Sequence, residues 1–114
     1  MIKSIGTTAV VVSDAAKSSE WYRDKLGLDV QGDPKMHWVT VGMKGSEHRL
    51  HLCQTEPLEK GNTGIAFVCD DVQKTYDELT KKGVNFTQKP TKEHWGTYAM
   101  LADPDGNEFW LIQE

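Results

Sequence analysis

The pattern of hydrophobic and polar positions in the first half of the chain predicts a strand, then a helix, then further strands. The run Thr8–Val12 is short and rich in β-branched residues, which predicts a buried strand. Ser13 and Asp14 follow it, and both are residue types that favour the N-cap of a helix. One face of that helix is predicted from residues spaced three or four apart, namely Ala15, Ser19, Tyr22 and Leu26. Gly27 supplies the left-handed residue that commonly ends a helix.

The second half of the chain repeats this order. Gly64–Cys69 predicts a strand, Asp70 and Asp71 predict a helix N-cap, and Gly83 predicts the helix end. The apolar stripe of this helix consists of Val72, Tyr76 and Leu79. Asp70 lies 56 positions after Asp14, and the two terminal glycines are also 56 positions apart, whereas the helical faces match better at 57. The pattern therefore predicts a duplicated unit, with its register open by one residue.

Strand-like runs follow each predicted helix. In the first half they are Leu28–Val30, His37–Val41 and Arg49–Cys53. In the second half they are Val84–Thr87, Gly96–Leu101 and Glu108–Ile112. Turn-forming residues separate them, at Gly32–Pro34, Lys44–Ser46, Lys89–Pro90 and Asp103–Gly106. Each unit is therefore strand, helix and three strands, and two sheets covered on one face by a helix can curve together around a cavity.

Length and charge limit the class of protein. A chain of 114 residues corresponds to one domain. We place the repeated modules at about 1–55 and 63–114, joined by a polar linker at Glu56–Asn62. The net charge is −4 and the basic residues are scattered, so the sequence offers no basic surface for nucleic acid.

The apolar runs and the cysteines indicate which cellular compartment to expect. No apolar run approaches the 18 or so residues that a membrane-spanning helix needs, so we expect no membrane association. Met1–Gly6 lacks the apolar core of a signal peptide, and we expect a cytoplasmic protein. Cys53 and Cys69 lie in apolar runs without a CxxC spacing, which favours buried, reduced thiols over redox or metal chemistry.

The acidic segment Asp103–Gly106 could suggest a calcium loop. Such a loop needs further oxygen ligands at fixed spacings and a downstream glutamate, and these are missing here. The composition Asp-Pro-Asp-Gly is typical of a tight turn between two strands, and we predict that turn.

Two local sequences resemble a known family. WYRDKLGL at Trp21–Leu28 and DPDGNEFWLI at Asp103–Ile112 stand in order around a repeat that covers nearly the whole chain. Together they resemble the vicinal-oxygen-chelate superfamily, which includes glyoxalase I, extradiol dioxygenases, fosfomycin-resistance enzymes and bleomycin-binding proteins. The resemblance implies an α+β fold in which two tandem βαβββ modules form curved mixed sheets around a cavity. It also implies a homodimer.

Catalytic members of that superfamily are similar in having four metal ligands, on the first and last strands of each module. The motifs of this chain align these positions with Thr7, His51, Gly64 and Trp110. His51 is a good ligand, whereas glycine has no side chain, tryptophan offers only an N–H donor and threonine is a weak neutral ligand. Catalytic metal sites need about three protein ligands. We therefore expect no metal and no other cofactor.

The same strands predict a binding surface for an organic ligand. Period-two alternation puts Arg49, His51 and Cys53 on one face, and Glu108, Trp110 and Ile112 on another. Trp110 would place an aromatic surface where the resemblance puts a metal, which suits an apolar or aromatic ligand in the cleft between sheets. The expected ligand-binding residues are Thr7, Trp38, Arg49, His51, Trp95, Glu108 and Trp110.

Three functions remain open at this point. The leading hypothesis is a metal-free small-molecule binding protein, similar to the bleomycin-binding members. The second is a metal-dependent enzyme, similar to glyoxalases or dioxygenases, with a non-standard ligand set that includes His51 and Glu108. The third is a metal-independent enzyme with His51 as general base, for which the sequence suggests no second catalytic residue. His51 can equally be a plain polar residue on a half-solvated sheet face.

Overall fold

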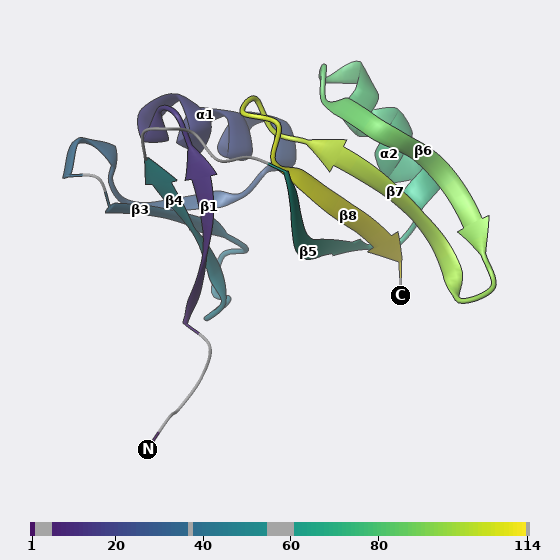
Figure 1. Ribbon diagram of the computed structural model, residues 1–114, viewed down its shortest axis with the longest axis horizontal. Helices are drawn as coiled ribbons and strands as arrows, with labels where there is room; N and C mark the ends of the chain where they lie inside the picture. The colour runs from purple at the N-terminus through teal and green to yellow at the C-terminus, as the bar shows by residue number, and fades with distance from the viewer. Residues whose placement is uncertain (2–5, 37, 55–60, 114) are drawn as a thin grey trace. The chain divides into compact units, whose positions relative to one another are not determined.

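The computed structural model describes residues 1, 6–36, 38–54 and 61–113, with the side chains of Met36 and Trp38 excepted. The chain divides into two compact units, Met1–Lys60 and Gly61–Glu114. Each unit contains one four-stranded mixed sheet and one α-helix (Figure 1). The predicted linker at Glu56–Asn62 lies largely outside the described residues, as does His37.

The first unit runs strand, helix and then three strands. Its elements are β1 (Thr7–Val12), α1 (Ala15–Leu26), β2 (Asp29–Asp33), the 3-10 helix η1 (Pro34–Met36), β3 (Trp38–Gly42) and β4 (Arg49–Gln54). The strand order is β1-β4-β3-β2, with β1 and β4 parallel and the other pairs antiparallel.

The second unit has the same layout. Its elements are β5 (Asn62–Cys69), α2 (Val72–Lys81), β6 (Asn85–Glu93), β7 (Gly96–Ala102) and β8 (Glu108–Gln113). The strand order is β5-β8-β7-β6, and again the first and last strands of the unit pair in parallel. The predicted α+β fold of two tandem βαβββ modules is confirmed. The enclosure of a cavity by the two sheets stays a prediction.

The two helices begin at equivalent aspartates. Asp14 accepts a hydrogen bond from the backbone N–H of Lys17, and Asp71 accepts one from that of Lys74, each at 3.0 Å. Both aspartates have extended backbone angles, as N-cap residues do. They are 57 positions apart. The offset between the two repeats, which the sequence left open between 56 and 57, is therefore 57, and Asp70 is not the N-cap.

Two glutamines at strand ends form hydrogen bonds with the first residues of the helices. Gln54, the last residue of β4, accepts a hydrogen bond through Oε1 from the backbone N–H of Ala15 at 2.9 Å. Gln113 in β8 accepts the corresponding bond from the backbone N–H of Val72 at 2.8 Å. The first N–H groups of a helix have no partner within the helix, so these side chains satisfy donors that would otherwise need water.

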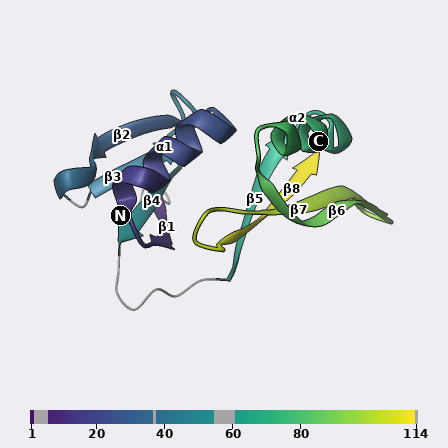
Figure 2. The same ribbon diagram turned by 90° about the horizontal axis from the view of Figure 1, so that it is seen from above.

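In each unit the helix packs on one face of the sheet (Figure 2), and buried hydrophobic side chains form a core between them. Core residues of the first unit are Val10, Val12, Ala15, Tyr22, Leu28, Val39, Val41, Leu50 and Leu52. Core residues of the second unit are Val72, Val84, Ala99, Leu101, Phe109 and Leu111. Because side chains alternate along a strand, the intervening residues form the sheet face that the helix does not cover.

Three sequence-based expectations about local structure are wrong. Gly32 and Asp33 belong to β2, and the chain turns in the following 3-10 helix. Lys89–Pro90 is not a turn, because β6 continues through it with register shifts on both sides of Gln88. β6 is an edge strand, where a proline can lack its N–H without removing a ladder hydrogen bond. The thiols of Cys53 and Cys69 are free but only partly buried.

Within the part of the chain that the structure describes, no helix combines the length and the hydropathy needed to cross a bilayer.

Candidate functional site

Three aromatic rings gather on the face of the second sheet opposite α2, and we call Trp95, Tyr98 and Trp110 the aromatic wall. The ring centroids of Tyr98 and Trp110 are 5.0 Å apart. Trp95, in the turn between β6 and β7, stacks on Tyr98 at 5.4 Å with 26° between the ring planes. Its centroid lies 6.3 Å from that of Trp110. Trp95 is 53% exposed, so the wall offers aromatic surface to solvent.

Strand register explains why these rings meet. In the antiparallel pair β7–β8, Tyr98 is opposite Ile112 and Met100 is opposite Trp110. On the other side of β8, Ala66 of β5 is opposite Trp110. Residues directly opposite each other share a face of the sheet, so Met100 and Ala66 flank Trp110, whereas the polar Thr91 of β6 is opposite Tyr98. The aromatic wall is therefore apolar along β8 and bordered by polar side chains on the β6 side.

Glu108 gives this surface a polar edge. It lies two residues before Trp110 on β8 and therefore on the same face, and it is partly buried. Its Oε2 accepts a hydrogen bond from Thr87 Oγ1 at 3.1 Å. A fixed carboxylate beside the rings can accept a hydrogen bond from a ligand or bind a cation.

The first unit presents a different surface on the sheet face opposite α1. Arg49 lies there and is 8% exposed. Its Nε donates to Thr40 Oγ1 at 2.8 Å, and its Nη2 donates to the backbone oxygen of Asp29 at 2.7 Å. Nη2 also lies 3.5 Å from Asp29 Oδ2. These contacts fix the guanidinium across β3 and β2.

The other predicted residues of the first unit flank Arg49. His51 is partly buried, lies on the same face two residues further along β4, and is opposite Thr40 and Ala9. Thr7 is exposed and opposite Arg49. The side chain of Trp38 lies outside the described residues.

The structure therefore groups the predicted site residues by unit. Trp95, Glu108 and Trp110 belong to the surface of the second sheet, and Thr7, Arg49 and His51 to that of the first. Sequence reasoning missed Tyr98, Thr40 and Asp29. Tyr98 could have been found, because a tight turn at Asp103–Gly106 sets the β7–β8 register and so puts Tyr98 one row from Trp110.

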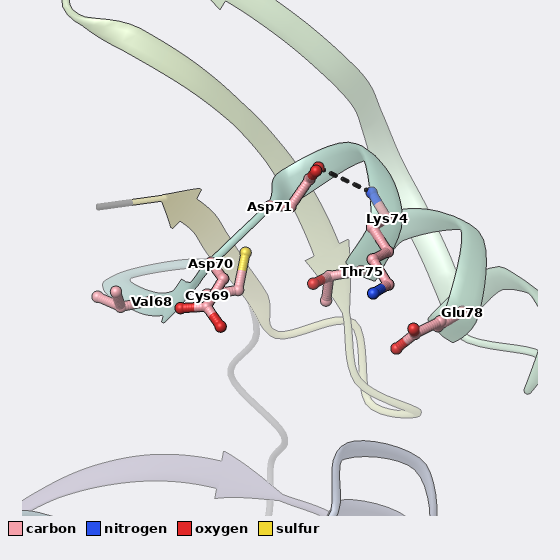
Figure 3. A pocket seen from close by; sticks show the side chains of 7 residues that line it. All are labelled: Val68, Cys69, Asp70, Asp71, Lys74, Thr75 and Glu78. Atoms are coloured by element: carbon pink, nitrogen blue, oxygen red, sulfur yellow. Dashed lines mark hydrogen bonds between the residues drawn. The ribbon is translucent and has the colours of Figure 1, made fainter.

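A shallow hollow of about 380 Å³ lies at the start of α2 (Figure 3). It is lined by Val68, Cys69, Asp70, Asp71, Lys74, Thr75 and Glu78. Its lining is mostly charged, and the Asp71 carboxylate is already used in capping the helix, as the dashed line in Figure 3 shows. This arrangement is what a solvated helix N-terminus produces, and it does not suit an apolar ligand.

Comparison with known proteins decides the family. A model of the Glyoxalase/Bleomycin resistance protein/Dioxygenase superfamily matches residues 4–111. The chain belongs to this superfamily. YetH of Bacillus subtilis (strain 168) is a relative with 36% identity, covering 97% of this chain and 98% of its own.

Solved structures of the superfamily share the fold over the full length. A member from Sphaerobacter thermophilus DSM 20745 is 33% identical with a TM-score of 0.88, covering 99% of this chain and 98% of that one. TnmS3, described as an antibiotic binding protein from Streptomyces sp. CB03234, is 31% identical with a TM-score of 0.84. It covers 98% of this chain and 96% of its own.

The four positions that the resemblance aligns with metal ligands, Thr7, His51, Gly64 and Trp110, form a poor donor set. His51 is the one strong donor among the four aligned residues. Gly64 lies in an irregular stretch of β5 with a φ of 73°, and the register between Asn62 and Ala66 shifts there. Among the described residues, no three His, Cys, Asp or Glu side chains are grouped so that they could hold a metal ion.

Proposed function

We propose that this protein binds a planar, apolar small molecule against the aromatic wall of the second sheet. The observation behind the proposal is the cluster of three rings, with centroids 5.0–6.3 Å apart, on the face of the second sheet opposite α2. Large apolar side chains gathered in one partly exposed patch commonly mark a binding surface. Offset or tilted rings also offer stacking geometry to a flat ligand.

The similarity to TnmS3 supports a binding role. That protein is described as binding an antibiotic, and it resembles this chain over nearly its whole length. Binding and sequestration require no reaction, so the poor donor set at the metal positions is no obstacle to this function. We propose that the binding needs no metal. The proposal includes a homodimer, which light scattering in solution would test.

A metal-dependent enzyme is the alternative, because the superfamily includes glyoxalases and dioxygenases. The observation in its favour is the Glu108 carboxylate, which lies partly exposed on the uncovered sheet face beside Trp110. His51 would be its partner ligand under this hypothesis. Metal content of the purified protein separates the two functions.

A matched pair of probes tests the binding function. 2-Naphthamide is planar, and decahydronaphthalene-2-carboxamide is its saturated counterpart with the same amide. By calorimetric titration in EDTA, we expect the planar amide to bind about tenfold more tightly. Trp110→Leu should remove most of that difference. Phe67→Leu is the control, because Phe67 stacks on the core residue Phe109 on the other face of the same sheet.

Two results would contradict the proposal. Equal affinity for the two amides would show that the rings contribute no stacking. Loss of binding in EDTA, restored by a divalent ion, would show that the ligand binds through a metal.

A further inference from the structure

The guanidinium of Arg49 is held along one edge only. Its Nε donates to Thr40 Oγ1, and its Nη2 donates to the backbone oxygens of Asp29 at 2.7 Å and Thr40 at 3.3 Å. The Asp29 carboxylate is also on the Nη2 side, 3.5 Å away. These bonds fix the plane of the guanidinium. They do not involve the other terminal nitrogen, Nη1.

Nη1 of Arg49 is buried and has no hydrogen-bond partner among the residues that the structure describes. It has two N–H donors, and a buried donor without a partner costs free energy. For an arginine whose role is only to connect the strands, this unpaired donor would be a free-energy cost without a benefit. Among the described residues no acceptor lies within hydrogen-bond distance of this donor pair, so an acceptor from outside them would satisfy it.

Gly42 makes room for this arrangement. A Cβ atom at that position would lie 3.3 Å from both Cγ and Nη1 of Arg49, which is tighter than nine in ten real contacts of a Cβ. The Arg49 side chain can therefore lie this close to β3 because residue 42 is glycine. A side chain there would push Nη1 away from its present position.

We infer that Arg49 is the binding group for the carboxylate of a small organic acid, which accepts hydrogen bonds from Nη1. A planar guanidinium, always charged and here removed from water, binds carboxylates strongly. The Asp29 carboxylate offsets part of the charge on the Nη2 side, so the unmatched charge and both unused N–H groups are at Nη1. All residues of this carboxylate site belong to the first unit, so its binding is independent of the aromatic wall.

Nuclear magnetic resonance of the arginine side chains tests the inference directly. The chain has two arginines, Arg23 and Arg49, so their Nε–H signals are easily assigned. Arg23 is an exposed internal control, paired with Asp24 at 2.8 Å. Benzoate should shift the Arg49 signal saturably and leave that of Arg23 in place. Benzamide, which has the same ring without the charge, should bind at least tenfold more weakly.

Variants separate recognition from a structural role. Arg49→Gln should abolish the preference for benzoate over benzamide, and Arg49→Lys should keep part of it. Gly42→Ala should weaken benzoate binding several-fold while every arginine atom is retained. Arg23→Gln, which changes the net charge equally, should leave benzoate affinity unchanged. The wild-type and Gly42→Ala titrations keep the test decisive even if Arg49→Gln does not fold.

Three results would overturn the inference. Equal shifts of Arg23 and Arg49 by benzoate would show non-specific charge attraction. Equal affinity for benzoate and benzamide would show that the anion is not recognised. Tighter binding of inorganic phosphate than of benzoate would mean that the site takes a free inorganic anion and not an organic acid.

Discussion

The ring centroids of Tyr98 and Trp110 lie 5.0 Å apart, with an angle of 42° between the ring planes. The two residues face the same side of neighbouring strands because the turn at the end of β7 sets the register of β7 against β8. This pair is the centre of the aromatic wall. A flat ligand on this surface would contact both rings.

Replacing Tyr98 should therefore weaken the binding of a planar ligand. An aromatic contact contributes about 0.5–1.5 kcal/mol beyond area burial, so Tyr98→Leu should raise the Kd of 2-naphthamide by about two- to twelvefold. Tyr98→Phe keeps the ring and should bind nearly as well as wild type. Calorimetric titration measures both. If Tyr98→Leu binds as tightly as wild type, Tyr98 is not part of the ligand surface.

Asp103 should matter for stability through the turn. Its Oδ1 accepts from the backbone N–H groups of Asp105 and Asn107, and its Oδ2 accepts from the Asn107 side chain. Asp103 is buried, so Asp103→Ala leaves donors without partners and should cost about 2–3 kcal/mol in the free energy of unfolding. Asp103→Asn keeps one acceptor oxygen and should cost less. Urea denaturation measures both, and equal losses would refute this account of the turn.

The glutamines that contact the helix starts should also stabilise the fold. Gln113→Ala removes the acceptor for the Val72 N–H and should cost about 1 kcal/mol in the free energy of unfolding, as a typical hydrogen bond does. Gln73→Ala is a matched control, because Gln73 is exposed on α2 and contacts only the Asp77 side chain among the bonds described. We expect it to stay within about 0.5 kcal/mol of wild type. Thermal unfolding that ranks the two variants the other way would argue against the capping role.

Metal content should be well below one ion per chain. One imidazole among the four aligned positions cannot hold a catalytic ion, since such sites need about three protein ligands. Elemental analysis of protein purified without chelator measures zinc, nickel, manganese and iron together. His51→Ala and Glu108→Gln should leave the values unchanged. A stoichiometric metal that either variant removes would favour the enzyme alternative.

Much of the fold follows from the sequence because local signals and the global fold agree. The caps, the helix-ending Gly27 and the period-two strands each predict the observed element. Pro90 was misleading because proline usually marks a turn, yet an edge strand tolerates it where the ladder is irregular. The register of the repeat was ambiguous because Asp70 and Asp71 are equally good cap residues. The better match of the helical faces at 57 agrees with the observed N-cap at Asp71.

The candidate site was less predictable, because it depends on contacts between strands. Trp110 could be placed by alternation within β8 alone. Its contact with Tyr98 requires the β7–β8 register, and the fixation of Arg49 requires Thr40 and Asp29 from two other strands. Alternation predicts which face a side chain is on, but it does not predict which neighbour it meets.

Nuclear Overhauser effects between bound 2-naphthamide and the protein are the most direct test of the proposed binding surface. We predict effects from the naphthalene protons to the rings of Tyr98 and Trp110 and to the Ile112 side chain. Effects to Lys74 and Glu78 instead, or none to the aromatic wall at saturation, would show that the ligand binds elsewhere and contradict the proposed function.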